Sequence, residues 1–277
     1  MKITPLSRHI GAEISELQLN DLSEHEFNRL YSAFLEYKVL FFRDQELTPD
    51  QHLALGQRFG ELEPPHPFFP HVESHPQIVV IETSRGNPPG ESFWHTDMTF
   101  QRFPPKCSIL HAQYVPERGG DTLWCSMAAV WQSLPESRRQ TLKGLEACHQ
   151  LHAFKNSRYD QTNEQGESIV DEKSVQYPPV FHPLMYVHPE TQEETLFINE
   201  QFTRYIDGMT PQESEACLQE LFEIARQDVF QVRFSWKAGS VAIWDNRVTQ
   251  HFAVTDYGDT PRKLHRVTVK GAENNSV

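Results

Sequence analysis

His95, Asp97 and His251 are the residues of this chain whose types point most directly to chemistry. Two imidazoles and one carboxylate form the facial triad, a ligand set that binds divalent iron and leaves coordination positions open. Side chains two apart in an extended segment share a face, so His95 and Asp97 can contact one ion. A single His-x-Asp sequence is more often part of a surface loop, so the prediction depends on the residues around it.

The segment before His251 predicts a rigid position for the second imidazole. Residues 241–244 form an apolar run typical of a strand, and Asp245 with Asn246 indicates a turn. Residues 248–253 can then be extended again, which would place His251 on a strand. Metal ligands are held more precisely on strands than on loops.

Arg262 and Arg266 follow His251 and could bind anions. Their spacing of four puts both on one face of an extended strand. A guanidinium makes a two-pronged contact with a carboxylate or sulfonate, so this face suggests two anionic small molecules beside the ion. A solvated strand edge with salt bridges is the alternative interpretation. Thr122, after the turn at Gly119 and Gly120, could offer its hydroxyl to a carboxylate, although turn chemistry explains this stretch equally well.

Both helices and strands must position these residues. Capping residues before apolar residues at helical spacing predict helices, and short apolar runs between turn signals predict strands. The predicted helices are one that begins after residue 23 and includes residues 27–35, one from residue 49 to between 56 and 60, and those at 127–134, 135–142 and 210–226. The predicted strands cover residues 39–42, 78–81, 107–114, 181–187, 195–198, 230–236, 240–245 and 264–269.

Two segments are predicted to lie outside the regular elements. Residues 84–92 contain two glycines and two prolines directly before the His-x-Asp sequence, which predicts a flexible loop that could act as a lid. Residues from about 155 to 179 are polar and show no periodicity, which predicts a mobile insertion.

The order of the elements predicts a mainly β fold with surrounding helices. Strands dominate the middle and the last third of the chain, and there is no internal repeat or long linker. This pattern favours an antiparallel barrel or jelly roll over a regular βαβ alternation. We therefore expect one domain over residues 1–277.

Composition excludes several classes of function. The formal net charge of −13, from 38 acidic and 25 basic residues, argues against a nucleic-acid-binding surface. The four cysteines form no Cys-x-x-Cys pair, so zinc-ribbon and redox motifs are absent and a reducing compartment is the simple account. No signal-peptide pattern and no apolar run of about 20 residues is present, so no membrane association and a cytoplasmic location are expected.

Eight segments and residues form a linked series along the chain: Ile10–Ile14, Phe41–Gln45, Arg58–Leu62, Trp94–Asp97, Gly119–Trp124, Trp244–His251, Arg262 and Arg266. Together, in this order, they resemble the taurine dioxygenase family of iron(II)- and 2-oxoglutarate-dependent oxygenases. The resemblance covers nearly the whole chain, and it implies the family's fold, a double-stranded β-helix, or jelly-roll, core.

The resemblance also implies roles for individual residues. Iron(II) would be bound by His95, Asp97 and His251, and 2-oxoglutarate by Arg262 with Thr122. The further positions that it implies are Arg266 and His66 for the substrate sulfonate, with Met98 and Phe202 as walls of the substrate pocket.

The reaction implied is hydroxylation of the carbon next to a sulfonate, with dioxygen and 2-oxoglutarate consumed. Taurine is the first substrate to expect, and its products would be aminoacetaldehyde, sulfite, succinate and carbon dioxide. The substrate is then a small anion, and relatives that form dimers or tetramers predict a homo-oligomer.

Two residues depart from the taurine pattern. Phe69 stands where the taurine enzymes have a tyrosine, and Glu91 lies near a position usually occupied by asparagine. Both positions lie toward the amine end of taurine. Loss of one hydroxyl contact costs about 1 kcal/mol, so these changes weaken the prediction of taurine and leave the chemistry unaffected.

Three alternatives remain open at this stage. The same chemistry could act on another alkanesulfonate, a sulfate ester, or an aryloxy or amino acid. A non-catalytic metal-binding barrel would not need Arg262. A zinc hydrolase could use His149 and His152, but a spacing of three on a strand sends these two rings to opposite faces.

Overall fold

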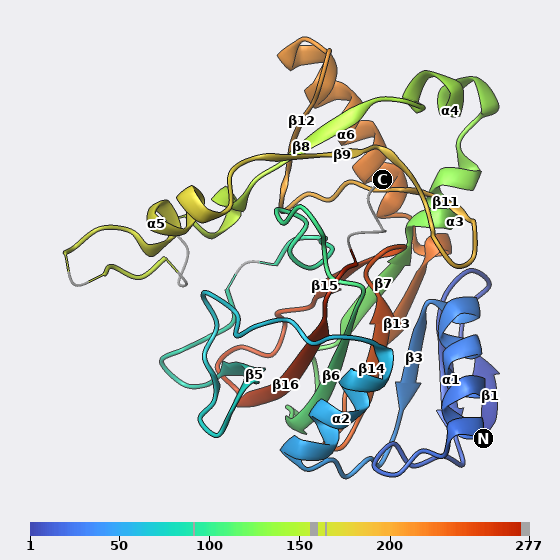
Figure 1. The fold of residues 1–277 in the computed structure, drawn as a ribbon, viewed down its shortest axis with the longest axis vertical. Coiled ribbons are helices and arrows are strands. Elements are labelled where there is room, and N and C mark those ends of the chain that lie inside the picture. Colours follow the sequence, from blue (N-terminus) through green and yellow to red (C-terminus); the bar gives the residue numbers. More distant parts are fainter. Residues whose placement is uncertain (91, 156–159, 164, 273–277) are drawn as a thin grey trace.

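Two facing β-sheets form the centre of the protein in this computed structural model, which describes residues 1–90, 92–155, 160–163 and 165–272 (Figure 1). All neighbouring strands of the large sheet are antiparallel except the parallel pair β2 and β3. In spatial order this sheet consists of β1 (Lys2–Pro5), β2 (Ala12–Ser15), β3 (Val39–Phe42), β14 (Val241–Asp245), β6 (Cys107–Tyr114), β16 (Arg262–Val269), β5 (His75–Thr83) and β4 (His71–Val72).

The small sheet closes the barrel over the inner face of the large one. It has the order β13 (Gln231–Phe234), β7 (Thr122–Ser126) and β15 (Thr249–Ala253). Phe41 of the large sheet stacks on Phe234 of the small sheet with ring centroids 4.2 Å apart, and the edge of the Phe41 ring meets Trp124. Strand alternation sends Phe41 inward and its neighbour Phe42 outward, so both faces of this sheet are apolar. The predicted β-rich jelly-roll core is confirmed.

Two N-terminal helices cover the outer face of the large sheet (Figure 1). α1 (Glu24–Tyr37) and α2 (Pro49–Phe59) each begin with a complete capping box, formed by Ser23 and by Thr48. The buried aromatic residues Phe34 and Phe59 meet edge to face at 5.3 Å between α1 and α2. These helices seal the side of the barrel away from the small sheet.

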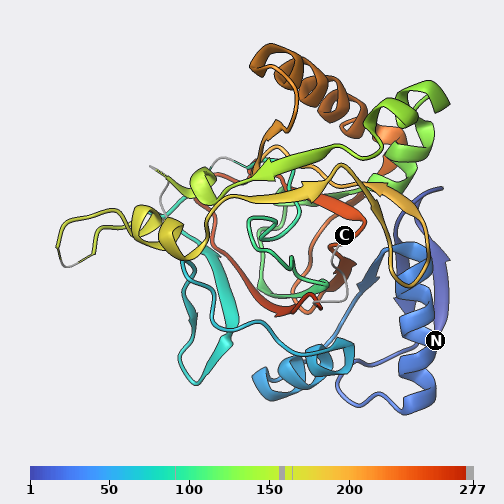
Figure 2. The same ribbon diagram turned by 45° about the horizontal axis from the view of Figure 1, so that its top comes forward.

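The remaining elements surround one end of the barrel, which faces the viewer in Figure 2. Helices α3 (Met127–Ser133) and α6 (Pro211–Ala225) pack together in one apolar cluster, and α5 lies on a segment that projects from the body. The other elements of this region are α4 (Glu136–Leu142), α5 (Ile169–Gln176), the short 3-10 helices η1 (Leu151–Phe154) and η2 (Asp228–Phe230), and the strands β8 (Glu146–His149), β9 (Val180–Pro183), β10 (Met185–Val187), β11 (Glu194–Leu196) and β12 (Thr203–Ile206).

The structure corrects three expectations about the elements. The stretch from 155 to 179 was expected to lack regular structure, but Ser168 caps the helix α5 there by accepting a hydrogen bond from the Asp171 backbone. The strand expected at 181–187 is divided at Leu184 into β9 and β10. The short strands β1, β2, β8 and β12 were not predicted. Within the described ranges, no helix is long and apolar enough to cross a membrane.

Candidate metal centre and anion pockets

His95 and His251 are direct neighbours across two paired segments. The backbone N–H of His95 donates to the carbonyl of His251 at 3.0 Å, and the reverse bond is 2.8 Å. The two imidazole centroids lie 4.1 Å apart. Thr96 strengthens the pairing, because its hydroxyl donates to the carbonyl of Thr249 at 2.8 Å. Pairing with β15 of the small sheet therefore holds the backbones of both histidines rigidly side by side.

Asp97 completes a three-ligand cluster with the two histidines. Its Oδ1 lies 4.0 Å from Nε2 of His95 and 4.0 Å from Nε2 of His251. One ligand atom from each residue lies within 4.8 Å of the others, and this is the sole such group of His, Cys, Asp and Glu found among the residues that the structure describes. Asp97 begins a turn directly after the paired segment, so it reaches the same point as His95 although it is not in a strand.

The protonation of these residues suits a divalent metal ion, which requires neutral imidazoles and an ionised carboxylate. Nδ1 of His95 lies 2.8 Å from the Phe93 carbonyl, which accepts its proton and leaves the Nε2 lone pair toward Asp97. Burial lowers the pKa of His95 and lowers that of His251 further. Both rings are therefore neutral near neutral pH, and the donor set fits iron(II).

Arg266 and Ser108 bind the two oxygens of the Asp97 carboxylate. Nη1 of Arg266 donates to Oδ1 at 2.7 Å, and the hydroxyl of Ser108 donates to Oδ2 at 2.7 Å. Burial alone would raise the pKa of Asp97, but the charge of Arg266, the two imidazoles and the Ser108 hydroxyl together hold it below its usual range. The carboxylate is therefore ionised at neutral pH.

Arg262 is buried without a carboxylate partner. Its side chain is on the same face of β16 as Arg266, and the residue is 5% exposed. Nη2 donates to the Gly120 carbonyl at 3.2 Å, Nε has no hydrogen-bond partner, and no acidic side chain of the described residues lies within ion-pair distance. Gly120 permits this approach, because its φ is +71° and a Cβ there would lie 3.3 Å from Nε of Arg262. A buried guanidinium without an acidic partner is unfavourable, and a bound anion would stabilise it.

Thr122 has a hydroxyl that can still donate a hydrogen bond. It is buried at the start of β7, and its oxygen accepts a bond from the indole N–H of Trp236 at 3.0 Å. Because an indole N–H can only donate, the Thr122 proton stays available for a carboxylate oxygen.

His66 and Phe69 lie beside Arg266. Nδ1 of His66 accepts the backbone N–H groups of Phe68 and Phe69, at 3.2 and 3.3 Å. Burial lowers the pKa of His66 to about 3, with the charge of Arg266 adding to the effect. The ring is therefore neutral and carries its proton on Nε2. The Phe69 ring lies 4.6 Å from the His66 ring and 5.7 Å from the Arg266 guanidinium.

Met98 and Phe202 belong to an apolar wall that the sequence analysis identified only in part. The side chains of Phe68 and Phe69 pack against this wall, and the Phe68 ring stacks on the Phe154 ring with centroids 5.0 Å apart. The buried members of the wall are Met98, Phe100, Leu151, Phe154, Val170 and Phe202. The wall is formed by η1, α5 and the turn after Asp97, so it includes part of the segment that was expected to be a mobile insertion.

The predicted lid loop lies near this region, and a cavity of about 400 Å³ adjoins it. Phe69, Ile81, Ser84 and Asn87 are among its lining residues. Ser84 and Asn87 bond to each other through their backbones at 2.8 and 3.0 Å, which forms a tight turn. Glu91 lies outside the described residues. Lid motion stays a prediction.

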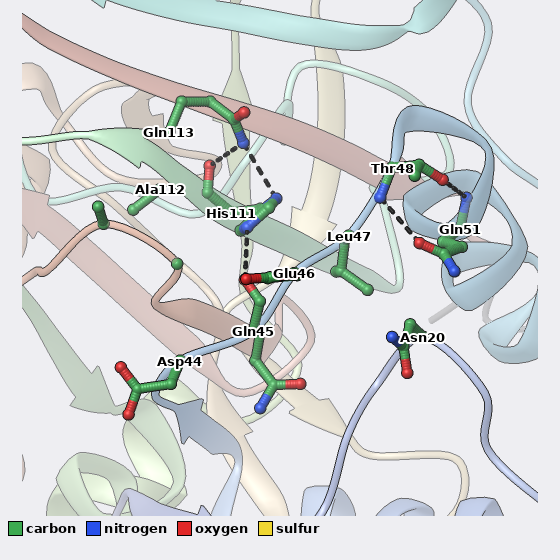
Figure 3. A pocket seen from close by; sticks show the side chains of 12 residues that line it. Asn20, Asp44, Gln45, Glu46, Leu47, Thr48, Gln51, His111, Ala112 and Gln113 are labelled. Carbon is green, nitrogen blue, oxygen red and sulfur yellow. Dashed lines mark hydrogen bonds between the residues drawn. The ribbon is translucent and has the colours of Figure 1, made fainter.

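Two other polar regions are accounted for by internal bonds. His149 lies at the end of β8, where its Nδ1 contacts the Thr99 hydroxyl at 2.9 Å, and His152 lies in η1, so this pair forms no metal cluster. A cavity of about 670 Å³ beside α2 and β6 is shown in Figure 3. Its His111 bonds to the Gln45 carbonyl and to Gln113, so it is part of the local structure.

Ser108 and Asn246 are site residues that the sequence analysis missed. Ser108 is the second residue of β6, and Asn246 is in the turn after β14. No motif marks a serine in an apolar strand. A signal existed for Asn246, which lies in the conspicuous segment before His251, but it was interpreted only as a turn residue.

Comparisons with known proteins show a consistent likeness. The family described as "Taurine catabolism dioxygenase TauD, TfdA family" matches residues 2–268. An alpha-ketoglutarate-dependent sulfate ester dioxygenase of Pseudomonas putida is 35% identical, over 98% of this chain and 90% of the relative. A taurine dioxygenase structure from Burkholderia xenovorans has a TM-score of 0.83 at 38% identity, over 98% of this chain and 89% of that one. The structure of AAD-2 with Mn(II) and N-oxalylglycine has a TM-score of 0.80 at 28% identity, over 98% of each chain.

Proposed function

Because the chain belongs to the TauD/TfdA family of 2-oxoglutarate-dependent dioxygenases, we propose that it hydroxylates the carbon attached to a sulfonate or sulfate-ester group of a small organic acid. Its cofactor is iron(II), with 2-oxoglutarate and dioxygen as cosubstrates. When bound, they supply the oxidant, and succinate and carbon dioxide are released. The homo-oligomer and the cytoplasmic location stay predictions.

The buried Arg262, which has no acidic partner among the described residues, is the observation that supports this proposal most directly. A folded protein rarely leaves a guanidinium buried without an anion, so the site is built for one. The free Nε of Arg262 and the free hydroxyl proton of Thr122 can bind one carboxylate of 2-oxoglutarate. His95, Asp97 and His251 would hold the iron.

Arg266 and His66 can bind the second anion. Nε of Arg266 is buried and has no hydrogen-bond partner, and the neutral His66 ring presents an N–H on Nε2. Both donors suit a sulfonate or sulfate oxygen. Because Arg266 also contacts the metal-binding carboxylate of Asp97, a substrate bound here has its neighbouring carbon beside the metal centre.

The aromatic side chains beside these donors favour an apolar substrate chain. These side chains are Phe68, Phe69 and Phe154, and Phe69 lacks the hydroxyl that a taurine enzyme has there. A taurine ammonium group would lose its hydration against these rings and gain only a cation–π contact, with no hydrogen-bond acceptor from them. We therefore place alkanesulfonates and alkyl sulfate esters before taurine as substrates.

A substrate panel tests this proposal. Taurine, alkanesulfonates of increasing length and alkyl sulfate esters are each incubated with iron(II), 2-oxoglutarate and dioxygen, and succinate, sulfite and sulfate are measured. We expect sulfite from sulfonates and sulfate from esters, in equal amounts to succinate. If an aryloxy or amino acid raises succinate while no sulfur acid does, the substrate assignment is wrong.

Phe69→Tyr separates the two substrate classes within the same protein. The added hydroxyl offers one hydrogen bond toward an ammonium group, worth about 1 kcal/mol or roughly a fivefold effect. We expect kcat/KM for taurine to rise by that factor relative to an alkyl sulfate. Phe181→Tyr, on the exposed β9, is the matched control and should change neither value. An equal change for both substrates would contradict the apolar-wall argument.

The metal and cosubstrate sites are tested without substrate. Iron(II) and 2-oxoglutarate are added without oxygen, and the weak visible charge-transfer band of the chelate is recorded. The proposal expects this band in the parent and its loss in Asp97→Ala. Iron that binds without producing the band when 2-oxoglutarate is added would overturn the cosubstrate assignment.

A further inference from the structure

Three buried side chains form a continuous series of hydrogen bonds that ends on a metal-binding carboxylate. The indole N–H of Trp244 donates to Oδ1 of Asn246 at 2.9 Å, and Nδ2 of Asn246 donates to Oγ of Ser108 at 3.1 Å. Ser108 then donates to Oδ2 of Asp97 at 2.7 Å. Trp244, Asn246 and Ser108 are each at most 1% exposed, and no step of this relay requires water. We call these three residues the Trp244 relay.

The direction of every bond in the relay follows from its first member. An indole N–H has no lone pair to offer, so it must face the amide oxygen of Asn246. The amide nitrogen of Asn246 then faces Ser108 and occupies a lone pair of its oxygen. The single hydroxyl proton of Ser108 is left to donate to Asp97. The relay therefore fixes a proton donor on one particular carboxylate oxygen.

The two oxygens of Asp97 consequently have different surroundings. Oδ1 is the oxygen that lies 4.0 Å from both imidazole Nε2 atoms, whereas Oδ2 is bound to Ser108. Each carboxylate oxygen has two lone pairs, so Oδ1 can keep its bond to Arg266 and still bind a metal. A carboxylate that bound through both oxygens would occupy one more coordination position.

We propose that the Trp244 relay positions Asp97 so that it binds the metal through Oδ1 alone, which keeps three coordination positions open. Two of these positions are needed by 2-oxoglutarate and one by dioxygen in the proposed function, on which this inference rests. Ser108 and Asn246 are positioning residues, because they act on the metal through Asp97. Their role resembles that of the outer groups that orient metal ligands in other proteins.

Ser108→Ala removes the donor on Oδ2 and leaves Asp97 in place. We expect cobalt(II), used as an oxygen-stable substitute for iron, to bind within about threefold of the parent, because Oδ2 becomes a second donor. The affinity of the cobalt-loaded protein for 2-oxoglutarate should fall at least tenfold, since Oδ2 competes for an open position. The cobalt absorption spectrum, with and without 2-oxoglutarate, reports both changes without turnover. Ser108→Thr keeps the hydroxyl and should restore the parent values.

Asn246→Asp reverses the direction of the hydrogen bond between residues 246 and 108 and keeps the Ser108 hydroxyl. The new carboxylate still accepts from Trp244, but it also accepts the Ser108 proton, so Oδ2 of Asp97 is released. We expect a loss of 2-oxoglutarate affinity similar to that of Ser108→Ala. In the double variant the two effects should not add, because both release the same oxygen. Additive losses would show that the new negative charge is the cause instead.

Ser240→Ala is the matched control for a buried serine of the same sheet. Ser240 is fully buried at the edge of β14, where its hydroxyl oxygen accepts hydrogen bonds from Arg43 and from the Lys237 backbone and has no contact with Asp97. It should leave the spectrum and the 2-oxoglutarate affinity unchanged. If Ser108→Ala binds 2-oxoglutarate as tightly as the parent, the inference is wrong. If 2-oxoglutarate does not bind to the metal of the parent protein, the proposed function itself is wrong.

Discussion

The two arginines of β16 have different partners, and this difference defines their roles. Arg266 is bonded to Asp97, whereas Arg262 donates to the Gly120 carbonyl and interacts with Tyr257, with no carboxylate of the described residues within ion-pair distance. One guanidinium is therefore part of the metal centre before any ligand arrives. The other is buried without an acidic partner. Burial lowers its pKa, because the charged form loses hydration, and Tyr257 opposes this effect.

Arg262→Lys should weaken 2-oxoglutarate binding more than it slows the reaction. A lysine keeps the charge but loses the two-pronged contact, which costs about 1.5–3 kcal/mol, or roughly a 10- to 100-fold increase in KM. The measurement is KM for 2-oxoglutarate at saturating substrate, with kcat changed less than threefold. Arg233→Lys, whose side chain is 54% exposed on the outside of β13, is the control. An unchanged KM in Arg262→Lys would remove this residue from the cosubstrate site.

Residue types could be predicted from the sequence better than their contacts. The facial-triad pattern, the same-face arginines and Thr122 are visible because each depends on spacing and type. The backbone pairing of His95 with His251, the bond from Arg266 to Asp97 and the role of Ser108 are not visible. These depend on how β6, β15 and β16 approach each other, which no local signal records.

The turn between β14 and β15 is held by a buried ion pair. Arg247 donates to both oxygens of Asp245, at 2.8 and 2.6 Å, and His188 contacts the same carboxylate at 3.1 Å. Burial would raise the pKa of Asp245, but Arg247 and His188 hold it below its usual range. Because this turn lies between the strand that carries Trp244 and the strand that carries His251, it fixes the spacing of both.

Arg247→Met should destabilise the protein by about 3–5 kcal/mol, because it leaves the Asp245 carboxylate buried and without its main partner. Urea unfolding measures this loss. Arg226→Met is the control, since its ion pair with Glu200 is 47% exposed on the arginine side and should contribute less than about 1 kcal/mol. Adding Asp245→Asn to Arg247→Met should recover part of the loss. Equal losses in the two single variants would contradict the argument.

Elements with a clear local signal were predicted well, and short ones without such a signal were not. The helices α1, α2 and α6 have complete capping boxes, β3 and β14 contain continuous apolar runs, and β6 and β16 have eight residues each. β8 and β12 have four residues each, and each is extended because it pairs with the other, which is distant in sequence. α5 has eight residues and almost no amphipathic pattern, so its helix depends on the Ser168 cap and on packing of Val170 against the aromatic wall.

The molecule as a whole is rich in buried neutral histidines, which makes its stability sensitive to mild acid. Burial lowers the pKa of His52 to about 3, and lowers the pKa values of His152 and His265 to about 4. In the unfolded chain each ring titrates near 6.5. Below that pH these rings bind more protons in the unfolded state than in the folded state, so their contribution to stability is complete above pH 6.5 and is lost as pH falls.

The contribution of His52 to the free energy of unfolding should therefore fall by about 2 kcal/mol between pH 7.5 and 5. His52→Gln can still donate a hydrogen bond to the Ile109 carbonyl, as Nε2 of His52 does at 3.1 Å. We expect the fall in the free energy of unfolding between pH 7.5 and 5 to be about 2 kcal/mol smaller in this variant than in the parent. Urea unfolding at several pH values measures it. Parallel curves for parent and variant would show that His52 does not titrate on unfolding.

The strand order of the large sheet has a consequence for biosynthesis. β14 lies between β3 and β6, and β16 lies between β6 and β5, so three strands made before residue 115 wait for partners made after residue 240. Until then the nascent sheet consists of separate pieces, and ribosome-bound chains that end at residue 240 should be digested readily by protease. His251 lies between the two late strands. Iron therefore has no complete site on the growing chain, and it enters only once synthesis has delivered the strands that close the barrel around it.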